Sequence, residues 1–442
     1  MTDTRRHALY SNIIPASISG CFTFLISVTD GIIIGRGVST AALGGVNIAV
    51  PFIFMYYALF AVVCAGGGTV AAVSAGKNDS DEAQNVFMHS LLLSILVGIG
   101  AAVIGSLFSE QISRLLGADQ MYIGYASTYI YWLSAYVLFE AVSTCIQTFL
   151  RIDGYQKLIT AIHIFGSVLN IVLDIVMVFV YHRGVFGAAF ATGVAQLLKC
   201  VLFLALFLRK KGGFRFTRFS IKPKLLWEIL YRGTPEALLE FGTVFTVASF
   251  NQVLLKHVGP IGVDAFAIVS YIASLATEMF FGVTVGLQPL LSVSYGKQDR
   301  DDIRYYTKGS IQYAVLLGAA LMALCFALRR PLCVLFSAEG ETLSYSVRHL
   351  WKFCAGMPFT GVASILSVYL YSTERTKQSI VYNVLRSFVV NVLVIRLFPL
   401  LFASDYIFFA YPAYQAVLIV IGLGITAIDK DSQRMKSRTD DR

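Results

Sequence analysis

Long apolar stretches recur along the whole chain and constrain its fold more than any other feature of the sequence. Stretches of about 20 or more mainly apolar residues are long enough to cross a bilayer as helices. Twelve occur, at residues 10–34, 43–75, 86–108, 122–149, 158–181, 184–208, 229–255, 262–295, 309–328, 349–372, 379–400 and 405–428. Only 14% of the residues are charged, against about 25% in a typical soluble domain. The sequence therefore predicts an all-α integral membrane protein with twelve transmembrane helices.

Lys and Arg are distributed unevenly between the loops that join these stretches. If both termini lie on one side, the loops and tails of that side hold 23 Lys and Arg residues and the opposite side about nine. Positive residues favour the cytoplasmic side of a bacterial-type membrane. We therefore expect both termini in the cytoplasm and a multi-pass protein of the cell (inner) membrane. Topology explains the net charge of +9 better than binding to nucleic acid does.

The two halves of the chain resemble each other. A shift of 220 residues aligns VSAGKNDSDE (73–82) with VSYGKQDRDD (293–302), and it also pairs Pro15 with Pro235 and Gly66 with Gly286. Six spans return the chain to its starting side, so the halves are expected to be parallel repeats. We predict an N-terminal lobe at 1–208, a basic cytoplasmic linker at 209–228 and a C-terminal lobe at 229–442. Two bundles around a central cleft are typical of a transporter.

One predicted span contains polar residues that a lipid-facing helix would exclude. In LNIVLDIVMVF (169–179), Asn170 and Asp174 lie on one helical face, and His163 and Ser167 extend that face. The first span has a similar face that ends at Asp30, and the sixth span has one with Thr192, Gln196 and Lys199. Such faces must meet each other or water, because hydrocarbon cannot satisfy them.

The two carboxyl groups on these faces favour a role in ion coupling. An Asp at the centre of a spanning helix costs about 3 kcal/mol on insertion scales, so it usually marks an ion or proton path. Asp30 and Asp174, with Asn and Thr oxygens, form a ligand set that suits a small cation such as Na⁺ or a shared proton.

Further residues are expected to serve the transport path. Pro15 lies inside the first span and Pro235 in the seventh, and each permits bending because proline removes a helix hydrogen bond. Other polar residues of the spans are expected to line the cleft: Glu140, Gln147, Glu240, Asn251 and Gln288.

The sequence contains no motif of an enzyme. There is no HExxH, no GxSxG and no kinase motif set, and the seven cysteines form no CxxC pair. AGGGT (65–69) lacks the GK[ST] of a phosphate-binding loop and is expected to allow close helix packing. We expect no catalytic activity and no cofactor.

Several segments resemble the multidrug and toxin extrusion (MATE) family along essentially the whole chain. They are SVTDGIIIGRGVSTAALGG (27–45), GGGTVAAVSAGK (66–77), LRIDGYQKLITAIHIFGSVLNIVLDIVMVFVYHRGVFGAAFATGVAQ (150–196) and GLQPLLSVSYGKQD (286–299). They are most similar to the bacterial branch that keeps its cation site in the N-terminal lobe. This resemblance implies a coupling site at Asp30, Asn170, Asp174 and Thr192, and a bend of the first helix at Pro15. The tenth span has no carboxylate, so a cation site in the C-terminal lobe is not implied.

The resemblance implies an antiporter that exports amphipathic or cationic organic compounds in exchange for H⁺ or Na⁺, by alternating access of two lobes. Its partners would be small organic substrates and membrane lipids, with no nucleic acid, and one chain would suffice as a monomer. The alternatives are a lipid-linked oligosaccharide flippase of the same superfamily and a receptor or scaffold without transport activity. The sequence leaves open the transported compound, the choice between H⁺ and Na⁺, the stoichiometry and the oligomeric state.

Overall fold

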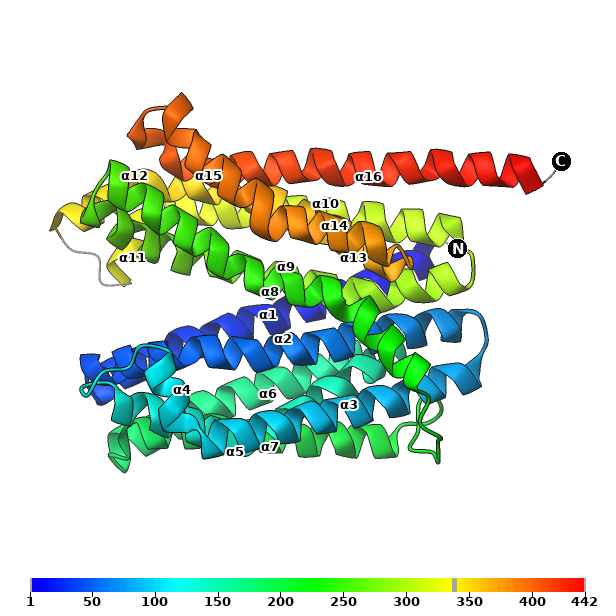
Figure 1. The fold of residues 1–442 in the computed structure, drawn as a ribbon, viewed down its shortest axis with the longest axis horizontal. Helices are drawn as coiled ribbons and strands as arrows, with labels where there is room; N and C mark the ends of the chain where they lie inside the picture. The colour runs from blue at the N-terminus through cyan, green and yellow to red at the C-terminus, as the bar shows by residue number, and fades with distance from the viewer. Residues whose placement is uncertain (1, 336–339, 441–442) are drawn as a thin grey trace. The chain divides into compact units, whose positions relative to one another are not determined.

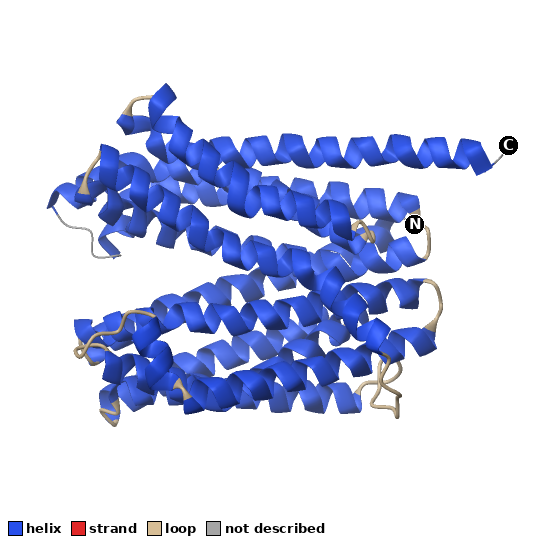
Figure 2. Ribbon diagram, viewed as in Figure 1, coloured by secondary structure: helices blue, strands red, loops and turns tan. Residues whose placement is uncertain are grey.

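The computed structural model describes residues 2–335 and 340–440, with backbone only at Thr2, Thr40, Glu240, Phe241 and 428–440. Helices make up nearly all of the described chain, which contains no β-strand, and loops occur only between helices (Figure 2). The described residues form two compact units. Unit 1 comprises 2–13, 238–291, 299–335 and 340–440, and unit 2 comprises 14–237 and 292–298.

Unit 2 contains the helices of the first half of the chain and the end of one from the second half. They are α1 (Thr2–Gly37) from residue 14 onward, α2 (Thr40–Gly76), α3 (Ser80–Leu107), α4 (Ser109–Leu115), α5 (Ile123–Ile152), α6 (Gln156–Ile175), the π-helix η1 (Val176–Val180), α7 (Gly184–Arg209), the start of α8 (Pro223–His257) and the end of α9 (Pro260–Gly296) (Figure 1).

Unit 1 contains the first residues of α1, most of α8 and α9, and the remaining helices. The remaining helices are α10 (Arg300–Ala327), α11 (Arg329–Leu335), α12 (Gly340–Cys354), α13 (Met357–Ser372), α14 (Thr376–Val384), the π-helix η2 (Leu385–Val389), α15 (Val390–Leu401), the 3₁₀-helix η3 (Ser404–Phe409) and α16 (Ala410–Asp440).

The predicted membrane spans are confirmed. Eleven described helical segments are long and apolar enough to cross a membrane, and the pair α12 and α13, bent by 41°, completes twelve. The bend falls between Cys354 and Met357, inside the predicted span 349–372. The short helices α4 and α11 were not predicted, because seven residues are too few to show a clear periodic pattern.

The repeat found in the sequence also appears in the helix boundaries. Helices α2 and α9 have 37 residues each, α3 and α10 have 28, and α4 and α11 have seven, and each second helix begins 220 residues after the first. Asn78 and Gln298 both adopt a left-handed conformation, with φ of 61° and 59°. Asp79 and Asp299 follow them and cap the next helix, each accepting a hydrogen bond from a backbone N–H of the first turn. The two halves therefore repeat one plan of helix lengths and turns.

The basic segment after α7 packs against unit 2. Lys210 pairs with Asp153, which also accepts a hydrogen bond from Phe214 N at 3.3 Å. Arg215 N donates to Gln84 Oε1 at 3.0 Å, and the Phe214 ring packs against Phe87. Helix α8 begins at Pro223, within the predicted linker. The predicted lobe boundaries themselves stay a prediction.

Three helices pass from one unit to the other. The divisions fall after Ile13 in α1, after Ala237 in α8 and after Leu291 in α9. Each of these helices contains a proline within three residues of its division, namely Pro15, Pro235 and Pro289. Because proline removes an intrahelical hydrogen bond, each helix is weakest near the point where it changes unit.

Candidate functional site: a buried carboxyl pair in unit 2

The polar face predicted on residues 163–174 lies inside the helix bundle of unit 2. Asn170 is 2% exposed and Asp174 is fully buried, both near the C-terminal end of α6. The apolar positions Val168 and Val172 are exposed on the outer side of the same helix. The helix therefore turns its polar residues inward and its apolar residues outward, as a membrane-spanning helix must.

The second carboxyl group comes from α1. The side chains of Asp30 and Asp174 lie within hydrogen-bonding reach of each other. Both oxygens of Asp174 and Oδ1 of Asp30 are buried, and no donor among the described residues reaches them. No Lys, Arg or His in the described part of the chain forms an ion pair with either carboxylate.

The neighbouring amide and hydroxyl belong to the same site. Asn170 Nδ2 donates a hydrogen bond to Thr192 Oγ1 of α7 at 3.2 Å. This bond leaves Asn170 Oδ1 buried and without a donor. The structure thus brings together all four residues of the predicted coupling site, Asp30, Asn170, Asp174 and Thr192, from three helices.

One residue near this site was not predicted. Tyr129 of α5 is buried and lies within electrostatic range of both carboxyl groups. It shares a helical face with Glu140, eleven residues later, which was singled out in the sequence. The spacing could have indicated Tyr129, but a single tyrosine in a spanning helix is a weak signal.

The site has the donor set of a small hard cation or of a proton. Four buried oxygens lack a donor: Asp30 Oδ1, Asn170 Oδ1 and both oxygens of Asp174. Carboxylate and amide oxygens suit hard cations. A proton shared between the two carboxyl groups would remove the repulsion between them equally well. No cluster of three His, Cys, Asp or Glu side chains that could hold a metal occurs among the described residues, so the amide and hydroxyl would have to contribute to any cation site.

Two of the residues expected to line a cleft have partners inside unit 2. Glu140 Oε2 lies 3.6 Å from Lys199 Nζ of α7. Gln147 Oε1 lies 2.7 Å from His163 Nε2 and accepts a hydrogen bond from Arg151 Nη2 at 3.0 Å. The sequence placed His163 and Lys199 on polar faces but did not predict which side chains they would meet.

The remaining predicted residues are spread over other helices. Asn251 lines an open pocket with Gln252 and Asp264 in unit 1. Gln288 is 8% exposed in α9. Glu240 lies in α8, and its side chain is outside the described residues. Pro15 lies in α1, and its carbonyl accepts a hydrogen bond from Ser19 Oγ at 3.2 Å.

Known proteins resemble the chain along most of its length. The multidrug export protein MepA of Staphylococcus saprophyticus is 23% identical over 403 residues, covering 89% of this chain and 86% of MepA. The probable multidrug resistance protein YoeA of Bacillus subtilis is 22% identical over 367 residues, covering 80% and 78%.

A solved structure shares the fold. It is described as an outward-facing multidrug resistance MATE family transporter of the MOP superfamily, and it is 21% identical with a TM-score of 0.90. The match covers 96% of this chain and 97% of the relative. The MatE family model matches residues 15–176 and 238–396, more than half of the chain. The chain therefore belongs to the MatE family, whose members are multi-pass membrane transporters and not enzymes.

Proposed function

We propose that this chain is a secondary antiporter that exports amphipathic, often cationic, organic compounds in exchange for H⁺ or Na⁺. The four buried oxygens without a donor at the Asp30–Asp174 pair carry the proposal. Their burial is costly unless a proton or a cation occupies the site. A cation that enters with the membrane potential contributes about 2.3 kcal/mol per 100 mV, which is enough to bias a two-state carrier.

The coupling would proceed through occupancy of the site. With a cation or proton bound, Asp30 of α1 and Asp174 of α6 attract the same charge and hold their helices together. Without it, the two carboxylates repel each other and favour a different arrangement of α1. The bend at Pro15 would let α1 change arrangement, and alternating access of the two lobes would carry the substrate across.

The class of substrate is inferred from the relatives. MepA and YoeA are named as multidrug export and multidrug resistance proteins. The chain has 33 Phe and 23 Tyr, which supply aromatic surface for amphipathic compounds. The excess of Lys and Arg on one set of loops supports cytoplasmic termini and a place in the cell (inner) membrane. We expect a monomer that needs no cofactor and contacts membrane lipids.

A lipid-linked oligosaccharide flippase would be expected to use free basic groups for an anionic pyrophosphate headgroup. The predicted spans hold few bases, and one of them, Lys199, is paired with Glu140. This pairing favours the exporter.

The decisive experiment is transport by the purified protein in liposomes. Efflux of a fluorescent organic cation is followed while a pH gradient or a Na⁺ gradient is imposed separately, for the wild type and for Asp174→Asn. We expect one gradient to drive efflux and Asp174→Asn to reduce it by about 10- to 100-fold, the usual range of coupling between sites. Ser27→Ala is the matched control, because within the described part of the chain its hydroxyl bonds only to the carbonyl of Thr23 in its own helix.

Either of two results would contradict the proposal. Full gradient-driven efflux by Asp174→Asn would exclude a coupling role for the pair. If the wild type shows no efflux under either gradient, the exporter hypothesis is excluded and the flippase becomes the favoured function.

A further inference from the structure

A second group of titratable residues, buried or half-buried, lies in unit 2 away from the carboxyl pair. It consists of Glu140 and Arg151 on α5, His163 on α6 and Lys199 on α7. We call these four residues the charged cluster. None of them belongs to the proposed coupling site, and the sequence did not predict their mutual contacts.

The bundle is shaped to hold Lys199. The Lys199 ammonium lies 3.6 Å from Glu140 Oε2, and the two side chains are 17% and 11% exposed. The aliphatic part of Lys199 crosses Gly166 of α6, where an added Cβ would lie 2.6 Å from Lys199 Cγ. The absence of a side chain at Gly166 therefore gives Lys199 the room to reach across α6 to α5.

A second cation completes the cluster. Arg151 Nη2 donates to Gln147 Oε1 at 3.0 Å, and His163 Nε2 lies 2.7 Å from the same oxygen. Arg151 Nε is buried without a hydrogen-bond partner, and His163 lies within electrostatic range of both Lys199 and Arg151. With Lys199 and Arg151 positive and Glu140 negative, the cluster carries an excess of one positive charge when His163 is neutral.

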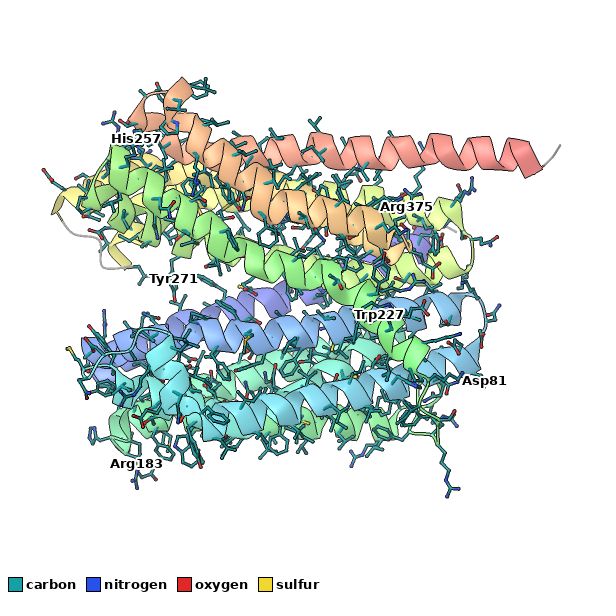
Figure 3. The ribbon with its side chains drawn as sticks, viewed as in Figure 1. Asp81, Arg183, Trp227, His257, Tyr271 and Arg375 are labelled. Carbon is teal, nitrogen blue, oxygen red and sulfur yellow. The ribbon has the colours of Figure 1, made fainter. Side chains whose placement is uncertain are left out.

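The cluster lies between the carboxyl pair and one end of unit 2. Asp81 and Arg183 mark the opposite ends of this unit (Figure 3). Asp174 lies near the Arg183 end, since it is the second-last residue of α6, and His163 is eleven residues earlier, about 16 Å along the helix. Lys199 is seven residues after Thr192, about 10 Å towards the Asp81 end.

Polar side chains lie between the two sites. Ser167 lies between His163 and Asn170 on the inner face of α6, and Gln196 lies between Thr192 and Lys199 on α7. Tyr57 of α2 lies within hydrogen-bonding reach of Gln196, and Ser19 Oγ donates to Thr160 Oγ1 at 3.1 Å. A proton that left the carboxyl pair would thus find polar groups along the bundle towards the Asp81 end.

We propose that Lys199 and Arg151 form an electrostatic barrier that prevents protons and cations from moving along these polar groups between the Asp30–Asp174 pair and the Asp81 end. The proposal rests on the proposed function, in which the pair binds the coupling ion. Fixed positive charges exclude cations from polar pathways because interaction between charges is strong in a poorly solvated interior. Glu140 holds Lys199 in place without cancelling the total positive charge.

The barrier would serve coupling. If the ion crosses an antiporter without the substrate, the ion gradient is dissipated and no substrate is transported. With the inner path closed, the pair exchanges its ion only through the conformational change that also moves the substrate. Four other titratable groups lie within electrostatic range of Glu140: Tyr56, Tyr57, Cys64 and Cys200.

The test measures proton entry without any organic substrate. The purified protein is reconstituted in liposomes that contain a pH-sensitive dye, and a K⁺ gradient with valinomycin makes the interior negative. The wild-type protein is expected to admit almost no protons. Lys199→Met removes one positive charge and leaves Glu140 as an unpaired acid, so proton entry should rise by about tenfold. Arg151→Gln, which keeps the Glu140–Lys199 pair, should change the rate in the same direction.

Charge-matched variants separate the barrier from a general loss of packing. Lys199→Arg keeps the charge, and Glu140→Gln combined with Lys199→Met restores the wild-type excess of one positive charge. Proton entry through both proteins should therefore be as slow as through the wild type. Glu140→Gln alone should also admit protons no faster than the wild type. Asp174→Asn added to Lys199→Met should abolish the leak if the leak passes through the pair.

Other results would overturn the barrier. If folded Lys199→Met and Arg151→Gln proteins admit protons no faster than the wild type, the barrier is excluded. A leak through Glu140→Gln, or in the charge-matched double variant, would attribute the leak to packing. Failure of the proposed function would appear separately, as wild-type protein that shows no gradient-driven efflux in the transport assay.

Discussion

Acceptor oxygens without donors are the most informative residue-scale feature of this protein. A buried unpaired polar group costs about 1–3 kcal/mol, and a charged group costs more. Asp30, Asn170 and Asp174 together contribute four such oxygens within one bundle. An evolved site accepts this cost when a ligand removes it, so the stability of the protein should depend on occupancy.

We expect the coupling ion to raise the melting temperature of the purified protein. An ion at 100 times its Kd adds about 2.7 kcal/mol to the free energy of unfolding. For Na⁺ coupling, melting in detergent should shift upwards with NaCl but not with choline chloride at equal ionic strength. For H⁺ coupling, it should shift upwards as the pH is lowered.

Asp174→Asn serves as the control for this measurement, because it removes one carboxylate and keeps the shape of the side chain. Its melting temperature should no longer respond to the ion. An equal response in the variant would show that the ion binds elsewhere.

Thr192→Val tests how much the Thr192 hydroxyl contributes to binding of the coupling ion, a contribution expected to be smaller than that of the carboxylates. The substitution removes the acceptor of the 3.2 Å bond from Asn170 and leaves the amide free to rotate. A hydrogen bond contributes about 1 kcal/mol, so apparent affinity for the coupling ion should fall about fivefold. The measurement is the ion concentration that gives half-maximal efflux.

Thr23→Val is the matched control, since the carbonyl of Ser19 in the same helix is the only partner of Thr23 Oγ1 among the described residues. Equal effects of the two variants would contradict a specific role for Thr192.

At the scale of elements, the main feature is the prolines of α1, α8 and α9, the three helices that pass from one unit to the other. Pro15, Pro235 and Pro289 each lie within three residues of a division between the units, whereas Pro51 lies inside α2 within unit 2. A proline in a helix interior costs about 3 kcal/mol. Its recurrence next to three divisions favours a role in movement over chance.

Pro15→Ala should therefore make the protein more stable and less active. Alanine restores the backbone hydrogen bond to the carbonyl of Ser11 and should raise the melting temperature by about 2 °C or more. Gradient-driven efflux should fall, because α1 bends less easily. Pro51→Ala should raise the melting temperature without a loss of efflux. Loss of efflux in both variants, or in neither, would contradict the hinge.

At the scale of the whole molecule, orientation in the membrane can be tested by labelling. The basic segment 209–222 and the α2–α3 turn lie at the Asp81 end of unit 2, and Arg183 lies at the other (Figure 3). We expect Lys211→Cys to resist a membrane-impermeant maleimide in intact cells and to react after permeabilisation. Arg183→Cys should react in intact cells. The parent chain shows the background from its seven native cysteines, six of which are buried. The reverse pattern would place the termini outside.

Much of the fold could be predicted because its determinants are local. Apolar length gives the number of spans, and helical spacing gives the inward face of α6 with Asn170 and Asp174. The match between 73–82 and 293–302 gave the repeat, which the structure extends to the lengths of α2 and α9, α3 and α10, and α4 and α11. The two seven-residue helices and the bend before Met357 were missed, because short helices lack a periodic pattern.

The sequence by itself determined that this protein is a twelve-helix membrane protein in two repeats, with two acids on polar helical faces. Only the tertiary structure decided which side chains meet. Asp30 reaches Asp174, Tyr129 of α5 lies within electrostatic range of both, and Lys199 reaches Glu140 because Gly166 leaves room for it. The physical reason is that periodicity fixes the direction of a side chain about its own helix. Its partner depends on how neighbouring helices rotate, shift and pack, which local spacing does not specify.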